Sequence, residues 1–78
     1  MQDKPELGEL YSYYRTGNEY RVICIGLHSE TGEQIVVYEA LYADAEFPLG
    51  QVWCRPVEMF MGSVKYDEKI VRRFVRVR

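Results

Sequence analysis

Histidine and cysteine, two residue types that often ligate metals or act in catalysis, are scarce in this sequence. His28 is the only histidine, so a complete metal site is not expected. Cys24 and Cys54 lie thirty positions apart without a C-x-x-C pair, which excludes a disulfide framework and the usual zinc spacings. We interpret each cysteine as a small buried hydrophobic residue and expect no metal and no other cofactor.

Long hydrophobic runs are also lacking. No uninterrupted apolar run exceeds four residues, as in Ile35 to Tyr38, and such a run is far too short to cross a bilayer. The first residues, Met1 to Glu6, have neither the basic end nor the apolar stretch of a signal peptide. We therefore expect a cytoplasmic protein with no membrane partner.

Common catalytic signatures are missing as well: the sequence contains no Gly-rich phosphate loop, nucleophile elbow or paired-carboxylate motif. Cys54 beside Arg55 could form an activated thiol with His28 as its base, but nothing in the sequence brings these residues together. We favour a protein that is not an enzyme and keep a small thiol or acid–base enzyme as the least supported alternative.

Hydrophobic and aromatic residues are plentiful. They make up 47% and 14% of the sequence, with seven tyrosines, so the chain can build a core and is not disordered. Its 78 residues have room for one core only, which predicts a single domain over 1–78 with an ordered part over about 8–77. The stability of so small a domain is expected to be marginal, on the order of 5 kcal/mol.

Gly, Pro, Asn and Asp divide the chain into short segments rich in Val, Ile and Tyr, a pattern typical of strands and tight turns. Even positions of the third segment (Val36, Tyr38, Ala40, Tyr42) are apolar or aromatic, so this face should meet the core. We predict a mostly β fold of five or six short strands in a bent sheet or barrel. The predicted strands are 8–15, 20–27, 34–42, 51–54, 64–66 and 70–77, with a long loop over 43–50, a helical or 3₁₀ turn over 56–60 and a turn over 67–69.

Five segments stand out by their order and spacing: HSETGE at 28–33, VVYEALY at 36–42, FPLG at 47–50, WCRP at 53–56 and EMF at 58–60. Together they resemble a bacterial family that is catalogued as domain of unknown function 1653. The resemblance runs from Gly8 to Phe74 and implies a compact SH3-like β-barrel, but it supplies no reaction. The family usually reads Tyr-x-His-aromatic-Lys-Gly-Asn near the start, whereas this chain has Tyr13 in place of the His and an inserted Thr16.

Trp53 and Arg55 form the most suggestive pair of residues. They are two positions apart on a predicted strand, so both side chains leave the same face. An indole beside a guanidinium suits a planar or anionic ligand, because it offers stacking, cation–π contact and bidentate hydrogen bonds. A structural alternative stays open, in which Trp53 belongs to the core and Arg55 pairs with Glu58 or Glu30.

Other residues could complete such a site. Four tyrosines, Tyr11, Tyr13, Tyr38 and Tyr42, could line a groove like those of SH3-type peptide binders, or could be core residues with wet hydroxyls. His28 and Glu30 flank one turn, where they could form a charged pair or simply cap turn amides. We predict a non-enzymatic binding module for a protein, a peptide or a small anionic ligand. Its predicted binding patch consists of Tyr11, His28, Glu30, Tyr42, Trp53 and Arg55.

Charge is unevenly distributed although the net charge is only −2. Residues 1–50 carry nine acids and three bases, giving −6, whereas residues 51–78 carry three acids and seven bases, giving +4. Nucleic-acid binding through the basic last strand is therefore the alternative function, with arginines tracking a phosphate backbone. Basic residues are also common guards of an edge strand. The arginines concerned are Arg72, Arg73, Arg76 and Arg78.

Overall fold

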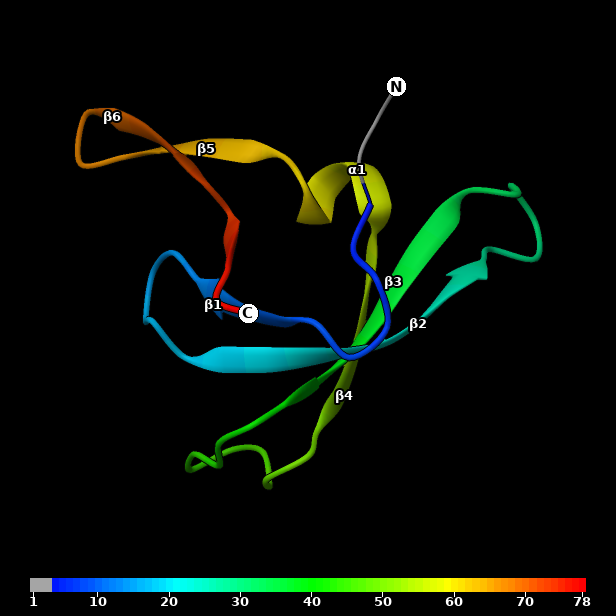
Figure 1. Cartoon of the computed structure of the whole chain (residues 1–78), viewed down its shortest axis with the longest axis horizontal. Coiled ribbons are helices and arrows are strands. Elements are labelled where there is room, and N and C mark those ends of the chain that lie inside the picture. The colour runs from blue at the N-terminus through cyan, green and yellow to red at the C-terminus, as the bar shows by residue number, and fades with distance from the viewer. Residues whose placement is uncertain (1–3) are drawn as a thin grey trace.

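The computed structural model describes residues 4–78, in which seven strands and one short helix are found (Figure 1). The mostly β prediction is confirmed, but the described residues form seven strands instead of five or six. No helix among them is long and apolar enough to cross a membrane. In chain order the elements are β1 (Leu10–Tyr13), β2 (Glu19–Leu27), β3 (Gln34–Ala40), β4 (Val52–Pro56), α1 (Val57–Phe60), β5 (Ser63–Tyr66), β6 (Lys69–Arg72) and β7 (Phe74–Arg76).

The single last strand predicted over 70–77 is wrong, because the chain changes sheets at Arg73. β6 pairs with β5 in a two-stranded sheet, whereas β7 pairs with β1 in the main sheet. The backbone of Arg73 bonds in two directions: its N–H donates to the carbonyl of Gly62, and its own carbonyl accepts from the N–H of Tyr14. These bonds to different parts of the molecule separate the two strands.

The main sheet is antiparallel throughout, with the strand order β4-β3-β2-β1-β7. The pairing of β2 with β3 shifts between Val22 and Cys24, which leaves Ile23 as one extra residue. Such a bulge bends a strand and increases its twist, and Figure 1 shows β2 changing direction along its length. The sheet curls around the core, but among residues 4–78 the two sheets do not close, so the predicted barrel is not confirmed.

The even face of β3 does meet the core, as predicted. Val36, Tyr38 and Ala40 are at most 4% exposed, and Tyr42 follows the end of β3 as a half-buried residue packed against the same cluster. The prediction that both cysteines are buried is wrong for Cys54, which is exposed, while Cys24 is half-buried. Cys54 alternates with two inward-facing residues of β4, so strand geometry turns it outward.

The helical turn predicted over 56–60 is confirmed as α1, which begins after Pro56. It buries Val57 and Phe60, and the Phe60 ring is fully shielded from solvent. The ring stacks on Phe74 of β7, with ring centres 4.1 Å apart and planes within 6° of parallel. This contact joins α1 to the last strand of the main sheet.

Replacement of Phe60 by Ala tests this contact. Phe60→Ala should cost about 3–5 kcal/mol, because it removes a fully buried ring and leaves a cavity, and so should largely unfold a domain of about 5 kcal/mol. Urea denaturation followed by near-ultraviolet circular dichroism measures the loss. Met59→Ala is the control: Met59 is the neighbour of Phe60 in α1 and is 48% exposed, so its loss should cost less than about 1 kcal/mol. Equal effects of the two changes would contradict the assignment of Phe60 to the core.

The β5–β6 hairpin has an unusual turn. Asp67 and Glu68 link the paired residues Tyr66 and Lys69, and both have positive φ, at 54° and 64°. Two-residue hairpin loops with positive φ at both positions favour Asn-Gly or Asp-Gly, because a left-handed conformation is unfavourable for residues with a Cβ. Glu68 therefore occupies a position suited to glycine.

Glu68→Gly should stabilise this hairpin by about 1 kcal/mol, because it removes the left-handed penalty. The expected result is roughly fivefold slower amide hydrogen exchange in β5 and β6. Glu33→Gly is the matched control. Glu33 lies in the β2–β3 loop and does not have a positive φ, so the change to glycine should be destabilising there. Unchanged or faster exchange in Glu68→Gly would contradict the argument.

Candidate functional site

Strand β4 places Trp53 and Arg55 on the same, inward face, as predicted. Both are half-buried, whereas Val52, which precedes Trp53, and Cys54, which lies between the two residues, are exposed. Pairing with β3 sets Trp53 opposite Tyr38. The indole is also covered by Phe47 from the loop after β3, with the ring centres 4.9 Å apart and nearly perpendicular.

These two residues lie in a pocket of about 210 Å³, which we call the aromatic pocket. Its walls come from five strands, β1, β2, β3, β4 and β7, so the whole main sheet shapes it. No acidic residue lines it, and its one charged lining residue is Arg55. The lining residues are Tyr13, Tyr20, Tyr38, Trp53, Arg55 and Phe74.

The Arg55 guanidinium is held by aromatic groups. Its Nε donates a hydrogen bond to the hydroxyl of Tyr38 at 3.3 Å, and its central carbon lies 5.5 Å from the centre of the Phe74 ring. The predicted structural pairing with Glu58 or Glu30 is not seen, because the one ion pair within residues 4–78 joins Arg76 to Glu9. The terminal nitrogens of Arg55 can therefore take up an anionic group from outside.

The hydroxyls of Tyr20 and Tyr38 stay uncharged at neutral pH. Burial raises the pKa of Tyr20, and its hydrogen bond with the Tyr42 hydroxyl raises it further. Burial also raises the pKa of Tyr38, against the opposing effect of the hydrogen bond from Arg55. The pocket thus presents one positive charge among neutral hydroxyls and aromatic faces.

The six residues predicted as one patch lie in three places. Trp53 and Arg55 come together in the aromatic pocket, and Tyr42 touches its wall by packing edge-on against Tyr20. His28 and Glu30 lie exposed in the β2–β3 loop, where Nδ1 of His28 accepts a hydrogen bond from the backbone N–H of Glu30. That bond is the turn-capping arrangement weighed as the alternative for this pair.

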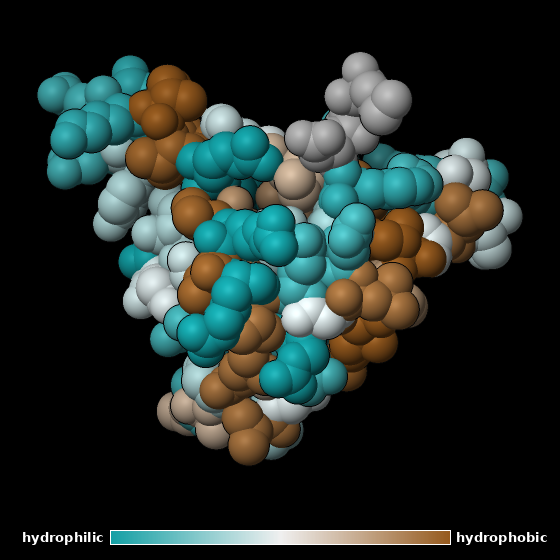
Figure 2. All heavy atoms as spheres, viewed as in Figure 1, coloured by the Kyte–Doolittle hydropathy of each residue, from teal (hydrophilic) through white to brown (hydrophobic). Residues whose placement is uncertain are grey.

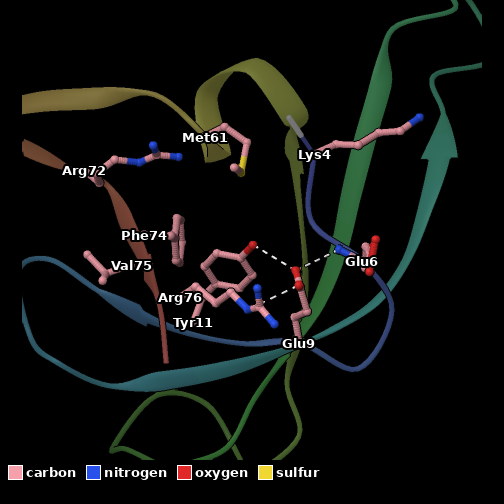
Figure 3. A pocket seen from close by; sticks show the side chains of 9 residues that line it. All are labelled: Lys4, Glu6, Glu9, Tyr11, Met61, Arg72, Phe74, Val75 and Arg76. Carbon is pink, nitrogen blue, oxygen red and sulfur yellow. Dashed lines mark hydrogen bonds and ion pairs between the residues drawn. The ribbon is translucent and has the colours of Figure 1, made fainter. Parts of the chain in front are cut away.

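The remaining predicted residue, Tyr11, lines a second and larger pocket (Figure 3). Its hydroxyl donates to Oε1 of Glu9 at 2.9 Å, and Oε2 of Glu9 pairs with Nε of Arg76 at 3.3 Å. Burial, together with the hydrogen bond to Glu9, raises the pKa of Tyr11 to about 12. We call this space the charged pocket, lined by Lys4, Glu6, Glu9, Tyr11, Met61, Arg72, Phe74, Val75 and Arg76.

The four arginines of the nucleic-acid alternative are divided by the change of sheet. Arg72 and Arg76 line the charged pocket from β6 and β7. Arg73 lies elsewhere, with its Nε donating to the backbone carbonyl of Met59 at 3.1 Å. Arg78 is exposed at the end of the chain. The arginines therefore do not form one continuous row along a single strand.

Four wall residues of the aromatic pocket were absent from the predicted patch. The sequence does point to Tyr38, because its strand pattern places Tyr38 on the inner face and because Trp53 and Arg55 are expected on one face of the next strand. Tyr38 lies beside Trp53 and Arg55 only in one register of their two strands. The length of the connecting loop, 43–50, does not determine that register. Tyr13, like Tyr38, was among the tyrosines considered for a groove but not for the patch, whereas Tyr20 and Phe74 were missed and come from strands distant in sequence.

Fold and site together define a class: a small, mostly β domain whose curled sheet carries an aromatic pocket around one arginine. The chain belongs to the family described as protein of unknown function (DUF1653), which matches residues 9–76. The structure is similar to the crystal structure of a protein of that family from Bordetella bronchiseptica, with a TM-score of 0.75 and 29% sequence identity over 94% of this chain and 87% of that one. No curated protein matches the chain.

The family resemblance found from the sequence is thus confirmed. One of the two departures noted from the sequence falls in the aromatic pocket, because Tyr13, which stands where the resemblance implies His, is one of the wall residues. The Tyr13 ring packs against Phe74, with ring centres 5.2 Å apart.

Alkaline titration tests the raised tyrosine pKa values. At about pH 11, Tyr11 and Tyr20 should still be largely protonated while ordinary exposed tyrosines are ionised, and Tyr38 should also ionise above the ordinary pKa of tyrosine. Because the folded pKa of each lies above its unfolded value near 10, the stabilisation is complete below about pH 10 and is lost as the pH rises toward about 12 for Tyr11. Tyrosinate absorbance and urea denaturation across this range measure both effects. Ionisation of all tyrosines near pH 10 in the folded protein would contradict the burial argument.

Proposed function

We propose that this domain is a non-enzymatic binding module and that its aromatic pocket binds an anionic group of a peptide, a protein or a small ligand. The observation that carries the proposal is the position of Arg55, a half-buried guanidinium set among aromatic rings without a carboxylate partner in residues 4–78. A carboxylate could accept two parallel hydrogen bonds from such a group. The rings around it would supply stacking area.

The size of the pocket narrows the kind of ligand. About 210 Å³ is less than the 300–1,000 Å³ of typical drug-sized sites, so it suits one side chain or one ring. Its single positive charge matches a single negative charge. An aromatic acid, or a chain-terminal carboxylate next to an aromatic side chain, fits both features.

The strand order supports a finer description of the fold. The last strand, β7, returns beside β1 after a short helical turn, and β2 bends at its bulge. We propose that the domain is a variant of the small SH3-like barrel in which the β5–β6 hairpin is inserted before the last strand. Bacterial origin and a cytoplasmic location stay predictions from the sequence.

The two alternative functions gain less from the structure. Nucleic-acid binding through Arg72, Arg73, Arg76 and Arg78 stays a prediction, although these residues do not share one strand. A thiol enzyme built on Cys54 has little support, because Cys54 and Arg55 leave opposite faces of β4 and His28 caps its own loop.

Trp53 is the only tryptophan, so its fluorescence reports directly on the aromatic pocket. Phenylacetate should change this fluorescence saturably, and the neutral analogue phenylacetamide should bind about tenfold more weakly or not at all, because it cannot pair with Arg55 as an anion. Arg55→Ala should remove the preference for the acid, whereas Arg55→Lys should retain part of it.

The matched control is Arg15→Ala, since Arg15 is exposed in the turn after β1 and lines none of the pockets described above. This variant should bind phenylacetate like the parent protein. If the folded parent shows no preference for the acid, or if Arg15→Ala weakens binding as much as Arg55→Ala, then Arg55 is not the anion anchor.

A further inference from the structure

The charged pocket is large enough for a small organic ligand. Its volume is about 550 Å³, within the range of known small-molecule sites. Figure 3 shows the parts of the chain that line it. These are the segment with Lys4 and Glu6, the stretch from Glu9 to Tyr11, Met61 after α1, and the consecutive strands β6 and β7. The pocket thus lies where the two sheets meet.

Glu9 does not offer a free negative charge to this pocket. Its Oε1 accepts hydrogen bonds from the backbone N–H of Glu6 and from the Tyr11 hydroxyl, both at 2.9 Å, and its Oε2 pairs with Arg76. The bond from Glu6 is the main reason that the pKa of Glu9 lies below its usual value. Its carboxylate instead holds Arg76 by Nε, so the terminal nitrogens of that guanidinium stay available.

Arg72 supplies a second guanidinium from the other sheet. Figure 3 shows it pointing into the pocket from β6, and among residues 4–78 no carboxylate pairs with it. Arg72 and Arg76 are both near enough to the Tyr11 hydroxyl to affect its pKa electrostatically. Lys4 adds a third positive charge at the edge of the pocket. Two carboxylates line the pocket: Glu9 is held by the bonds described above, and Glu6 supplies the other negative charge.

Apolar groups form the rest of the lining. Tyr11 and Phe74 are almost fully buried but border the pocket, and Met61 is half-buried beside them. An apolar or aromatic body could pack on these groups while its anionic end faces the two guanidiniums. The lining therefore combines an anion-binding edge with an apolar floor.

We propose that the charged pocket is a second binding site and that it takes a small phosphorylated organic ligand, with the phosphate between Arg72 and Arg76. A phosphate monoester carries close to two negative charges at neutral pH and three acceptor oxygens, which matches two guanidiniums on separate strands better than a single carboxylate does. Its organic part packs against Tyr11, Met61 and Phe74. The site does not include Arg55, which lines the aromatic pocket, although Phe74 borders both pockets.

Titration of the ¹⁵N-labelled protein with phenyl phosphate, followed by nuclear magnetic resonance, tests the site. Saturable shifts are expected at the amides of Met61, Val75 and Arg76, and inorganic phosphate should bind more weakly because it lacks the apolar body. Arg72→Ala should weaken phenyl phosphate binding about tenfold or more, and Arg72→Lys should weaken it less.

Two controls separate a built site from general positive charge. Arg78→Ala removes the same charge from an exposed position that does not line the pocket, and should change affinity less than about twofold. In Arg55→Ala the shifts at Met61, Val75 and Arg76 should still saturate, with an affinity within about twofold of the parent protein, whereas anion binding reported by Trp53 in the aromatic pocket should be lost, so that failure of the aromatic pocket is distinguishable from failure of this site.

Three results would overturn the proposal. One is the absence of saturable shifts at about 10 mM phenyl phosphate, and another is an equal loss of affinity in Arg72→Ala and Arg78→Ala. The third is binding of single-stranded oligonucleotides that strengthens with their length while phenyl phosphate does not bind, since that result would assign these arginines to a nucleic-acid backbone.

Discussion

The stacked rings of Phe60 and Phe74 are the contact on which the rest of the structure depends. Phe60 anchors α1 and Phe74 anchors β7, so their contact brings the last strand back beside β1. Phe74 also packs against Tyr20 and Tyr38, and it lines both pockets. Without this pair the strands that form the pockets would lose their common support.

The same aromatic side chains build the core of this small domain and the walls of its proposed binding pocket. Large rings bury much apolar area per residue, which matters when a chain has so few residues to bury. Rings such as Tyr20 and Tyr38 also reach the surface with their hydroxyl edges and form the wall around Arg55. Stability and the proposed binding therefore rest on the same side chains, and a change in the pocket wall also affects the core.

Local patterns predicted the parts of the fold that depend on neighbouring residues. Alternation along β3 identified its buried face, Pro56 located the start of α1, and the two-residue spacing of Trp53 and Arg55 placed them on one face. The last strand was mispredicted because 70–77 looks uniform in composition, and only the backbone bonds of Arg73 show where the chain changes sheets.

By itself, the sequence determined the class of fold, the approximate strands and the pair at the centre of the aromatic pocket, because these follow from periodicity, turn chemistry and local spacing. The family followed from the resemblance of its motifs. Only the tertiary structure decided which tyrosines surround Arg55, and that Glu9 holds Arg76 opposite Arg72. These contacts join residues from separate strands, and strand register and order depend on packing across the whole core, which no single segment encodes.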